Sequence, residues 1–423
     1  MASDLPRTRD RSRRFDVVLW GASGFTGRLV AEYLVRHYAD TDLRLALAGR
    51  NEGKLEDVRR GLAAIDDRAA DLPILTGDSF DRASLDAIAA DAEVVCTTVG
   101  PYAKYGGELV AACVAYGTDY CDLTGETHFI RRMIDAHQDE AEKTGARIVH
   151  CCGFDSIPSD LGTLVVQDAF HERHGRYAEE VRFVAGESRG GVSGGTAASM
   201  IELLEEAAED RSVRRILGDP YALNPEGERT GPDGSDQQGV RYDEDLDMWT
   251  GPFVMAAINT RIVRRSHALM GYPWGRDFRY SESMSFGGGP KGLLTSVVVT
   301  GVLGGVVAGS ALPPVRVLLK KRLPKPGEGP SAEQREKGFF RVRLVAKGRD
   351  EAGNPATLRG LVEGQNDPGY GETAKMLGES AVCLALDGAS LEAGGGIRTP
   401  ASTMGLRLVE RLRDAGMTFD PKP

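Results

Sequence analysis

The glycine-rich stretch near the N-terminus constrains the fold of this chain more than any other feature of its sequence. An apolar run, Val17 to Trp20, leads directly into Gly21, Gly24 and Gly27, and a helical pattern of apolar residues follows. This order of strand, glycine turn and helix is typical of the first βα unit of a dinucleotide-binding fold. The three glycines permit, in order, the tight turn, the approach of a pyrophosphate and close packing of helix on strand. The spacing GxxGxxG differs from the commoner GxGxxG, so a glycine turn without a ligand stays an alternative.

The helix after this turn would present free backbone N–H groups to the phosphates of a bound dinucleotide. We therefore predict that the whole loop contacts the cofactor, through Gly21, Ala22, Ser23, Gly24, Phe25, Thr26 and Gly27.

The residue that follows the second predicted strand indicates which nicotinamide cofactor binds. An acidic residue there binds the 2′-hydroxyl of NAD, whereas an arginine accommodates the 2′-phosphate of NADP. The position is Arg50, and the first carboxylate after it is Glu52. Arg50 thus predicts NADP. Its alternative roles are to cap the next helix or to pair with Glu52.

Two further segments at the ends of predicted strands complete the predicted cofactor site. Asp78 follows the third strand and is predicted to bind the adenine amino group, with a turn- or helix-capping role as the alternative. Tyr102 follows the fourth strand and is predicted to face the nicotinamide ring as a catalytic residue, with a core aromatic as the alternative. The loop before Tyr102 is predicted to line the pyrophosphate and nicotinamide through Thr98, Gly100 and Pro101.

Two polar clusters, residues 119–126 and 150–160, follow later predicted strands and are the candidates for proton transfer. Asp122, Glu126 and Asp155 would serve as proton donors or substrate-orienting groups if burial raises their pKa. Asp155 is the predicted catalytic residue among them, and helix capping or loop bracing is the alternative for each. None of the twelve tyrosines has a lysine four residues later, which argues against a short-chain dehydrogenase mechanism.

Strand and helix patterns alternate in the first part of the chain, which predicts a parallel sheet with helices on both faces. The predicted class is α/β: a Rossmann-type parallel sheet domain with a second α+β domain inserted before a C-terminal helix. The predicted boundaries are a disordered N-terminus at 1–14, the NADP-binding domain at 15–160 with 399–423 returning to it, and an α+β substrate and oligomerisation domain at 161–398. The polar, acidic segment 224–248 is predicted to be a mobile excursion or lid. The strand candidates of the first part are 15–20, 43–48, 73–76, 93–98, 118–121 and 147–151.

Composition restricts the class of function. The chain has 423 residues with 52 basic and 62 acidic side chains, and no basic cluster with interleaved aromatics, so a nucleic-acid partner is not expected. The six cysteines form no CxxC pair, which fits a reduced cytoplasmic compartment and no metal site.

One uncharged segment, 292–312, has about the length that spans a bilayer and is followed by Arg316, Lys320, Lys321 and Arg322. We predict a peripheral membrane contact there, at the inner face of the plasma membrane; a buried helix or a homodimer interface is the alternative.

Five ordered motifs resemble those of the saccharopine dehydrogenase-like oxidoreductases, and within that family the mycobacterial trans-acting enoyl reductases of lipid synthesis. They are GASGFTG, AGR at 48–50, TTVGPYAKYG at 97–106, GTDYCDLTGE at 117–126 and GFDSIPSDLG at 153–162. Similar segments continue to TPASTMG at 399–405, so the resemblance covers nearly the whole chain.

The resemblance implies an NADP-binding Rossmann domain and a second domain that carries the substrate. For the lipid branch it implies hydride transfer to a lipid-like enoyl intermediate held on a partner synthase, in cell-envelope lipid and glycolipid synthesis. The alternatives are a saccharopine-type C–N dehydrogenase, whose substrate carboxylates Arg261, Arg264 and Arg265 would bind, and a non-catalytic NADP-bound scaffold at a membrane.

Overall fold

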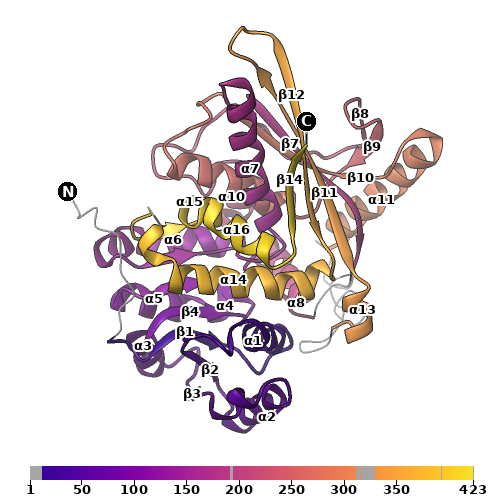
Figure 1. The fold of residues 1–423 in the computed structure, drawn as a ribbon. Coiled ribbons are helices and arrows are strands. Elements are labelled where there is room, and N and C mark those ends of the chain that lie inside the picture. The colour runs from indigo at the N-terminus through magenta and orange to yellow at the C-terminus, as the bar shows by residue number, and fades with distance from the viewer. Residues whose placement is uncertain (1–11, 191–193, 311–314, 316–328, 392, 423) are drawn as a thin grey trace. The chain divides into compact units, whose positions relative to one another are not determined.

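The computed structural model describes residues 12–190, 194–310, 315, 329–391 and 393–422 (Figure 1). The chain divides into two compact units. The first comprises 1–157, 327–329 and 369–415, and the second comprises 158–326, 330–368 and 416–423. Most of the predicted disordered N-terminus lies outside the described residues. Arg13 does not fit that prediction, because its guanidinium donates to the Ala89 carbonyl at 3.1 Å.

The first unit is built on a seven-stranded sheet in the order β13-β6-β5-β4-β1-β2-β3, in which every pairing is parallel. The chain reverses direction across the sheet between β1 and β4, which is where doubly wound sheets bind ligands beyond the carboxyl ends of their strands. The strands are β1 (Phe15–Trp20), β2 (Leu45–Gly49), β3 (Ile74–Thr76), β4 (Ala92–Thr97), β5 (Asp119–Cys121), β6 (Arg147–Val149) and β13 (Gly396–Arg398).

The helices of this unit pack in two groups: α3, α5 and α6 contact one another in sequence order, while α1 contacts both α2 and α14. Their bounds are α1 (Phe25–Tyr38), α2 (Glu52–Ala63), α3 (Arg82–Asp91), α4 (Tyr102–Tyr105), α5 (Gly107–Tyr116), α6 (Thr127–Thr144), α14 (Thr373–Leu386), α15 (Pro400–Thr403) and α16 (Gly405–Asp414). The β1 strand is completely buried, since five of its six residues are apolar and the sixth, Asp16, pairs with Arg44 at 2.7 Å.

The return of the chain to the first unit starts at Gly369 rather than at the predicted 399, and it brings α14 with it. Helix α14 packs on β1, β4 and β5 and is buried from Thr373 to Ala385. Its Glu379 accepts hydrogen bonds from Tyr33 and Tyr38 of α1 at 2.5 and 2.7 Å and from Arg411 of α16 at 3.3 Å. A carboxylate with these three donors ties the returning helices to the first βα unit.

The second unit is an α+β structure whose sheet has the order β14-β12-β11-β7-β10-β9-β8. β7 and β10 run parallel, and the other described pairs are antiparallel. Its last strand comes from residues that were predicted to return to the first domain. The strands are β7 (Glu180–Arg189), β8 (Arg241–Asp243), β9 (Met248–Gly251), β10 (Arg279–Ser285), β11 (Phe339–Arg349), β12 (Pro355–Gly364) and β14 (Thr418–Lys422). The helices are α7 (Ile157–His174), α8 (Gly194–Glu209), α9 (Arg211–Gly218), α10 (Ala256–Leu269), α11 (Gly289–Ser310) and α13 (Ala332–Glu336).

Candidate functional site

The glycine turn between β1 and α1 has the geometry of a phosphate cradle. Gly21 has a φ of +89°, which L side chains rarely adopt, and its carbonyl accepts the Gly24 N–H at 2.9 Å. A Cβ at Gly27 would lie 2.1 Å from the Gly21 carbonyl oxygen, so only glycine lets α1 start this close to the turn. The N-cap of α1 is Gly24, and the first turn of the helix carries no acidic residue. The positive end of the helix dipole is therefore available to an anion.

The loop after β4 lies against this turn. The Thr98 N–H donates to the Trp20 carbonyl at 3.1 Å, and the Thr98 hydroxyl donates to the Gly21 carbonyl at 3.3 Å. The Val99 side chain also abuts Gly21, since a Cβ there would lie 2.5 Å from Val99 Cγ2. The structure therefore brings the loop of Thr98, Gly100 and Pro101 together with the glycine turn at the point where the sheet order reverses.

Arg50 is exposed at the end of β2. The cap of α2 is Asn51, whose Oδ1 accepts the Lys54 N–H at 2.9 Å, so Arg50 does not cap that helix. Arg50 also makes no ion pair with any residue that the structure describes, Glu52 included. A Cβ at Gly49 would lie 3.8 Å from the Ser23 hydroxyl, which places the end of β2 beside the glycine loop. The guanidinium is thus available to a phosphate near that loop.

Asp78 lies in a turn after β3, where its Oδ1 accepts the Phe80 N–H at 2.9 Å. This is the turn-forming role that was the alternative to adenine binding. The hydrogen bond within the turn does not exclude a contact with adenine, because a carboxylate accepts several hydrogen bonds. Its contact with adenine stays a prediction.

Tyr370, in the helical turn Pro368–Glu372, is a neighbour of the glycine turn that the sequence analysis did not identify. Its ring lies edge-on to Phe25, the first residue of α1, with centroids 4.8 Å apart. It belongs to the segment DPGYGETAKML at 367–377, which also resembles the family but whose apolar pattern alone predicts neither a strand nor a helix. The contact fixes the Phe25 side chain beside the phosphate cradle.

Asp155 follows β6 at the same carboxyl edge and stands in a turn before α7. No hydrogen bond or ion pair reaches its carboxyl group from the part of the chain that the structure describes. The side chain is partly exposed, but the protein around it displaces enough water to raise the pKa of Asp155 to about 6. Its turn is held in place by the Phe154 N–H, which donates to the Thr373 hydroxyl at 3.2 Å. A carboxyl with this pKa that no described residue engages suits proton transfer near neutral pH.

Tyr102 and Glu126 are used by the first unit's own structure. Tyr102 is 3% exposed, and its hydroxyl donates to the Thr97 carbonyl at 3.2 Å. Burial, together with the charge of Asp122, raises the pKa of Tyr102 well above its ordinary value. Glu126 accepts the N–H groups of Tyr102 and Ala103 at 2.9 and 2.7 Å and thereby caps α4. Tyr102 therefore lies in the core, which was the alternative to facing the nicotinamide. Its hydroxyl is already engaged, which argues against a direct catalytic role.

Asp122 is likewise a bracing residue. It is fully buried and accepts the His150 ring Nδ1 at 2.7 Å, the Tyr120 hydroxyl at 2.9 Å and the N–H groups of Cys151 and Thr124 at 3.1 Å. These bonds join the ends of β5 and β6, and they leave Asp155 as the candidate donor of the three acids.

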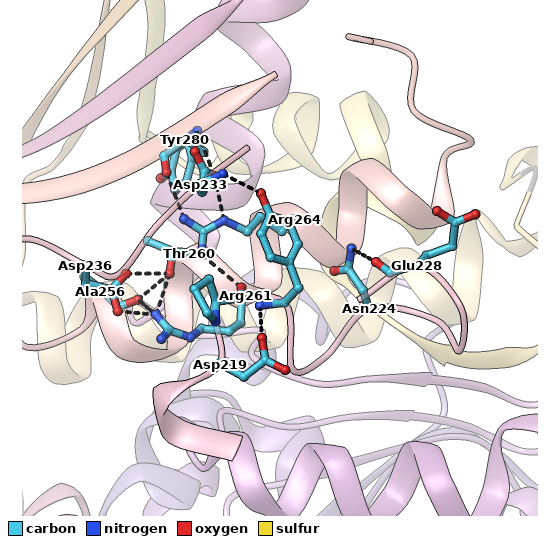
Figure 2. A network of polar contacts seen from close by, with 12 residues as sticks. Asp219, Asn224, Glu228, Asp233, Asp236, Ala256, Thr260, Arg261, Arg264 and Tyr280 are labelled. Atoms are coloured by element: carbon cyan, nitrogen blue, oxygen red, sulfur yellow. Dashed lines mark hydrogen bonds and ion pairs between the residues drawn. The ribbon is translucent and has the colours of Figure 1, made fainter. Parts of the chain in front are cut away.

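The three arginines of α10 are engaged inside the second unit, and Figure 2 shows the contacts of Arg261 and Arg264. Their contacts argue against the alternative in which they bind substrate carboxylates. Arg261 pairs with Asp236 and donates to the Leu217 carbonyl, and Arg265 donates to the Leu223 carbonyl. Arg264 pairs with Asp233 at 2.7 Å and donates to the Pro220 and Tyr280 carbonyls, both at 3.0 Å. All three side chains are almost completely buried. They also fasten the segment predicted as a mobile lid, which contains β8 and the start of β9.

Comparison with known proteins agrees with this arrangement. The family profile described as the saccharopine dehydrogenase NADP-binding domain matches residues 17–149. The chain is 45% identical to a Mycobacterium tuberculosis protein provisionally named a trans-acting enoyl reductase, and the match covers 96% of this chain and 97% of that protein. It is 40% identical, at the same coverage, to the trans-acting enoyl reductase of Mycobacterium ulcerans. The chain belongs to the trans-acting enoyl reductase family. It is an NAD(P)-dependent oxidoreductase.

A solved structure shows the same fold. The saccharopine dehydrogenase (L-Glu forming) of Saccharomyces cerevisiae matches 96% of this chain and 99% of its own, with a TM-score of 0.56 at 14% identity. The Rossmann-type sheet and the second sheet domain expected from the sequence are therefore confirmed.

The cofactor of this reductase is NADP(H), as the matched NADP-binding domain indicates. The residues present fit that cofactor. Gly21, Gly24 and Gly27 leave room for a pyrophosphate at the N-terminus of α1, where a Cβ on Gly24 would lie 3.2 Å from the Gly21 carbonyl oxygen. Arg50 supplies a cation at the strand end that NAD enzymes fill with an acid. Among the described residues, no group of three or more His, Cys, Asp or Glu side chains is placed to hold a metal ion.

Proposed function

We propose that this protein reduces the carbon–carbon double bond of an unsaturated, lipid-like acyl intermediate in cell-envelope lipid or glycolipid synthesis. The observation that carries the proposal is similarity along the whole chain, at 40–45% identity, to proteins named trans-acting enoyl reductases. The word trans-acting in those names supports a substrate that arrives on a separate partner synthase. When bound, NADPH supplies the hydride for such a reduction.

The protein's own residues would orient the cofactor and manage the proton. The N-terminus of α1 and Arg50 hold the two phosphate-bearing regions of the dinucleotide, which fixes the rest of the cofactor relative to the strand ends. Asp155, with its pKa raised to about 6, would deliver the proton that completes reduction of the double bond, directly or through one water molecule. Tyr102 would act only through packing, because its hydroxyl is already engaged.

A saccharopine-type C–N dehydrogenase is the second candidate, favoured by the shared fold and by the matched NADP-binding domain. Such an enzyme binds an amino-acid adduct with several carboxylates, and the arginines expected to bind them are buried and paired in the second unit. A cationic substrate site built from α10 would require breaking those pairs. We therefore rank the acyl substrate above the amino-acid adduct.

The proposal also includes a cytoplasmic enzyme working at the inner face of a membrane, since lipid-like intermediates partition there. An acyl chain long enough to need a carrier would reach the enzyme either on its synthase or from the bilayer surface. In the alternative of a non-catalytic scaffold, the protein would also lie at the membrane, but it would bind NADPH without oxidising it.

The experiment compares substrate classes on one purified enzyme. NADPH oxidation is followed with α,β-unsaturated acyl thioesters of increasing chain length, and with an amine plus a keto acid in parallel. The proposal predicts turnover with the thioesters alone, rising with chain length. Turnover only with the amine and keto acid would favour the C–N dehydrogenase. NADPH binding without turnover on either class would favour the scaffold.

A further inference from the structure

Helix α11 carries an apolar surface that the reductase function does not use. It has 22 residues, of which Lys291 is the single charged one. By length and composition its first part, Gly289–Val306, is apolar enough to cross a membrane, yet only 11% of that part is buried. A helix that is apolar on all sides is ordinarily enclosed by protein or by lipid. The large apolar side chains left exposed on it are Leu293, Leu294, Val297, Val298, Val302 and Val306.

A narrow stripe attaches α11 to its own unit. The helix packs against β9, and among its residues of described burial Gly292 and Ser296, one turn apart, are buried. Two turns from Gly292, Thr300 approaches Gly251 of β9 so closely that a Cβ there would lie 2.8 Å from the Thr300 hydroxyl oxygen. Because this face is fixed on the sheet, lipid cannot surround the helix on all sides while the unit stays folded.

The exposed apolar side chains cover most of the remaining circumference. At about 100° per residue, the positions from Leu293 to Val306 span roughly 220° of the helix. The apolar stripe by which a helix packs on a protein is typically nearer 100° wide. Leu294 and Val298 lie near the middle of the arc and are 66% and 54% exposed, and Val302, one turn beyond Val298, is 60% exposed. Lipid chains can conform to an arc this wide, whereas a flat protein surface would cover only part of it.

The charges near the helix indicate the type of membrane surface that it would bind. Lys291 stands at the start of α11, and the sequence that follows the helix is basic, with Arg316, Lys320, Lys321 and Arg322. Basic residues in the sequence next to an apolar helix favour binding to membranes that contain anionic lipids. A second copy of this chain would bring the same positive charges together, so electrostatics disfavours it as the occupant.

We infer that α11 is a monotopic anchor that inserts its outer arc into an anionic membrane surface while its inner stripe stays on β9. The helix is about 33 Å long and would lie in the plane of the membrane instead of crossing it. The inference rests on the proposed function only in that a lipid-like substrate gives the anchor its purpose. The binding itself requires neither cofactor nor substrate.

Vesicle cosedimentation of the full chain tests the anchor. We expect the protein to pellet with phosphatidylcholine vesicles that contain phosphatidylglycerol, and less with pure phosphatidylcholine. The double variant Val298→Asp/Val302→Asp should bind at least about tenfold more weakly, because carboxylates are costly in the acyl region. Both side chains are exposed, so the variant should fold, which circular dichroism checks. The matched control Leu406→Asp, on the exposed side of α16 (42% exposed), should bind like the wild type.

Three results would overturn the inference. They are no binding of the wild type to either vesicle, equal binding of the double variant, and a dimer without lipid that the double variant dissociates while vesicles bind neither protein. The last result would assign the arc to a second copy of the chain. A separate assay tests the proposed function: NADPH oxidation with a short, water-soluble enoyl thioester. The double variant should catalyse this reaction at the wild-type rate.

Discussion

Replacement of Gly27 by alanine tests the phosphate cradle at the position where the structure leaves least room. The added Cβ would lie 2.1 Å from the Gly21 carbonyl oxygen, 2.8 Å from the Gly21 carbonyl carbon and 3.0 Å from Ala22 Cα. All three atoms belong to the backbone, so no side chain can rotate away. Real Cβ atoms essentially never come within 3.0 Å of another heavy atom, and the turn and helix must therefore separate by about 0.9 Å.

The magnitude follows from that displacement. Forcing extra volume into a packed site costs about 1–3 kcal/mol, which should appear as a lower melting temperature. The N–H groups at the start of α1 move by about 0.9 Å relative to the β1 turn, which would break a charge-assisted hydrogen bond to the phosphate that is worth about 1.5–3 kcal/mol, or on the order of 100-fold in Kd. We expect the Kd for NADPH to rise by about that factor.

The assay is a fluorescence titration with NADPH, run beside a thermal melt that reports whether the variant is folded. Gly61→Ala is the matched control, because Gly61 lies in α2, is exposed and has no heavy atom within 4 Å of an added Cβ. It should leave the Kd unchanged and stabilise α2 by up to about 1 kcal/mol. A folded Gly27→Ala protein that binds NADPH with wild-type affinity would refute the assignment of the cradle.

Three further predictions concern the cofactor, the proton and the second unit. Arg50→Asp should weaken NADPH binding by about tenfold or more and leave NADH binding unchanged or improved, as titrations with both cofactors would show; equal loss for both would contradict the NADP assignment. Since burial raises the pKa of Asp155 to about 6, kcat/KM should fall as pH rises through about 6 and Asp155→Asn should remove that limb of the profile, whereas an unchanged profile would exclude the residue as donor. Because folding raises the pKa of Asp155 from 3.8 to about 6, the folded state is favoured most when the carboxyl is protonated, and this contribution is lost as pH rises through about 6. Above that pH, Asp155→Asn should therefore have a larger free energy of unfolding than the wild type in urea titrations. Arg264→Met leaves Asp233 without its cation and should lower the free energy of unfolding by about 3–5 kcal/mol, while Arg276→Met, which breaks an exposed pair, should lower it far less; comparable losses in chemical denaturation would contradict the role given to Arg264.

The first half of the chain was predictable because local signals and tertiary structure agree there. Apolar runs of strand length end in glycine or capping residues, and the predicted run 15–20 is β1 to the residue. The position of Arg50 followed from the same regularity, since the end of β2 fixes where the discriminating residue lies.

The return of α14 was not predictable in the same way. Thr373–Leu386 is apolar enough for a core helix, but nothing local says which of two cores buries it. Its place depends on Glu379 meeting Tyr33, Tyr38 and Arg411, which are far from it in sequence.

The polar residues divide for a similar reason. Asp122, Glu126 and Asp155 occupy equivalent places after strands, so the sequence alone offers each the same role. The structure distinguishes them by their partners: Asp122 and Glu126 accept bonds from backbone N–H groups nearby, while none reaches Asp155 in the described chain. Arg261 and Arg264 of α10 show the converse, because their charges suggested a ligand but are paired with Asp236 and Asp233 of the preceding segment (Figure 2).

The most direct test of the central claim follows the hydride itself. The enzyme is incubated with NADPH deuterated at C4 and a long-chain α,β-unsaturated acyl thioester, and the acyl product is examined by mass spectrometry. The account predicts a saturated acyl chain that carries one deuterium, with NADP⁺ formed in equal amount. A chain that stays unsaturated and free of deuterium while the enzyme binds NADPH would contradict it, and so would deuterium found only in the product of an amine and a keto acid.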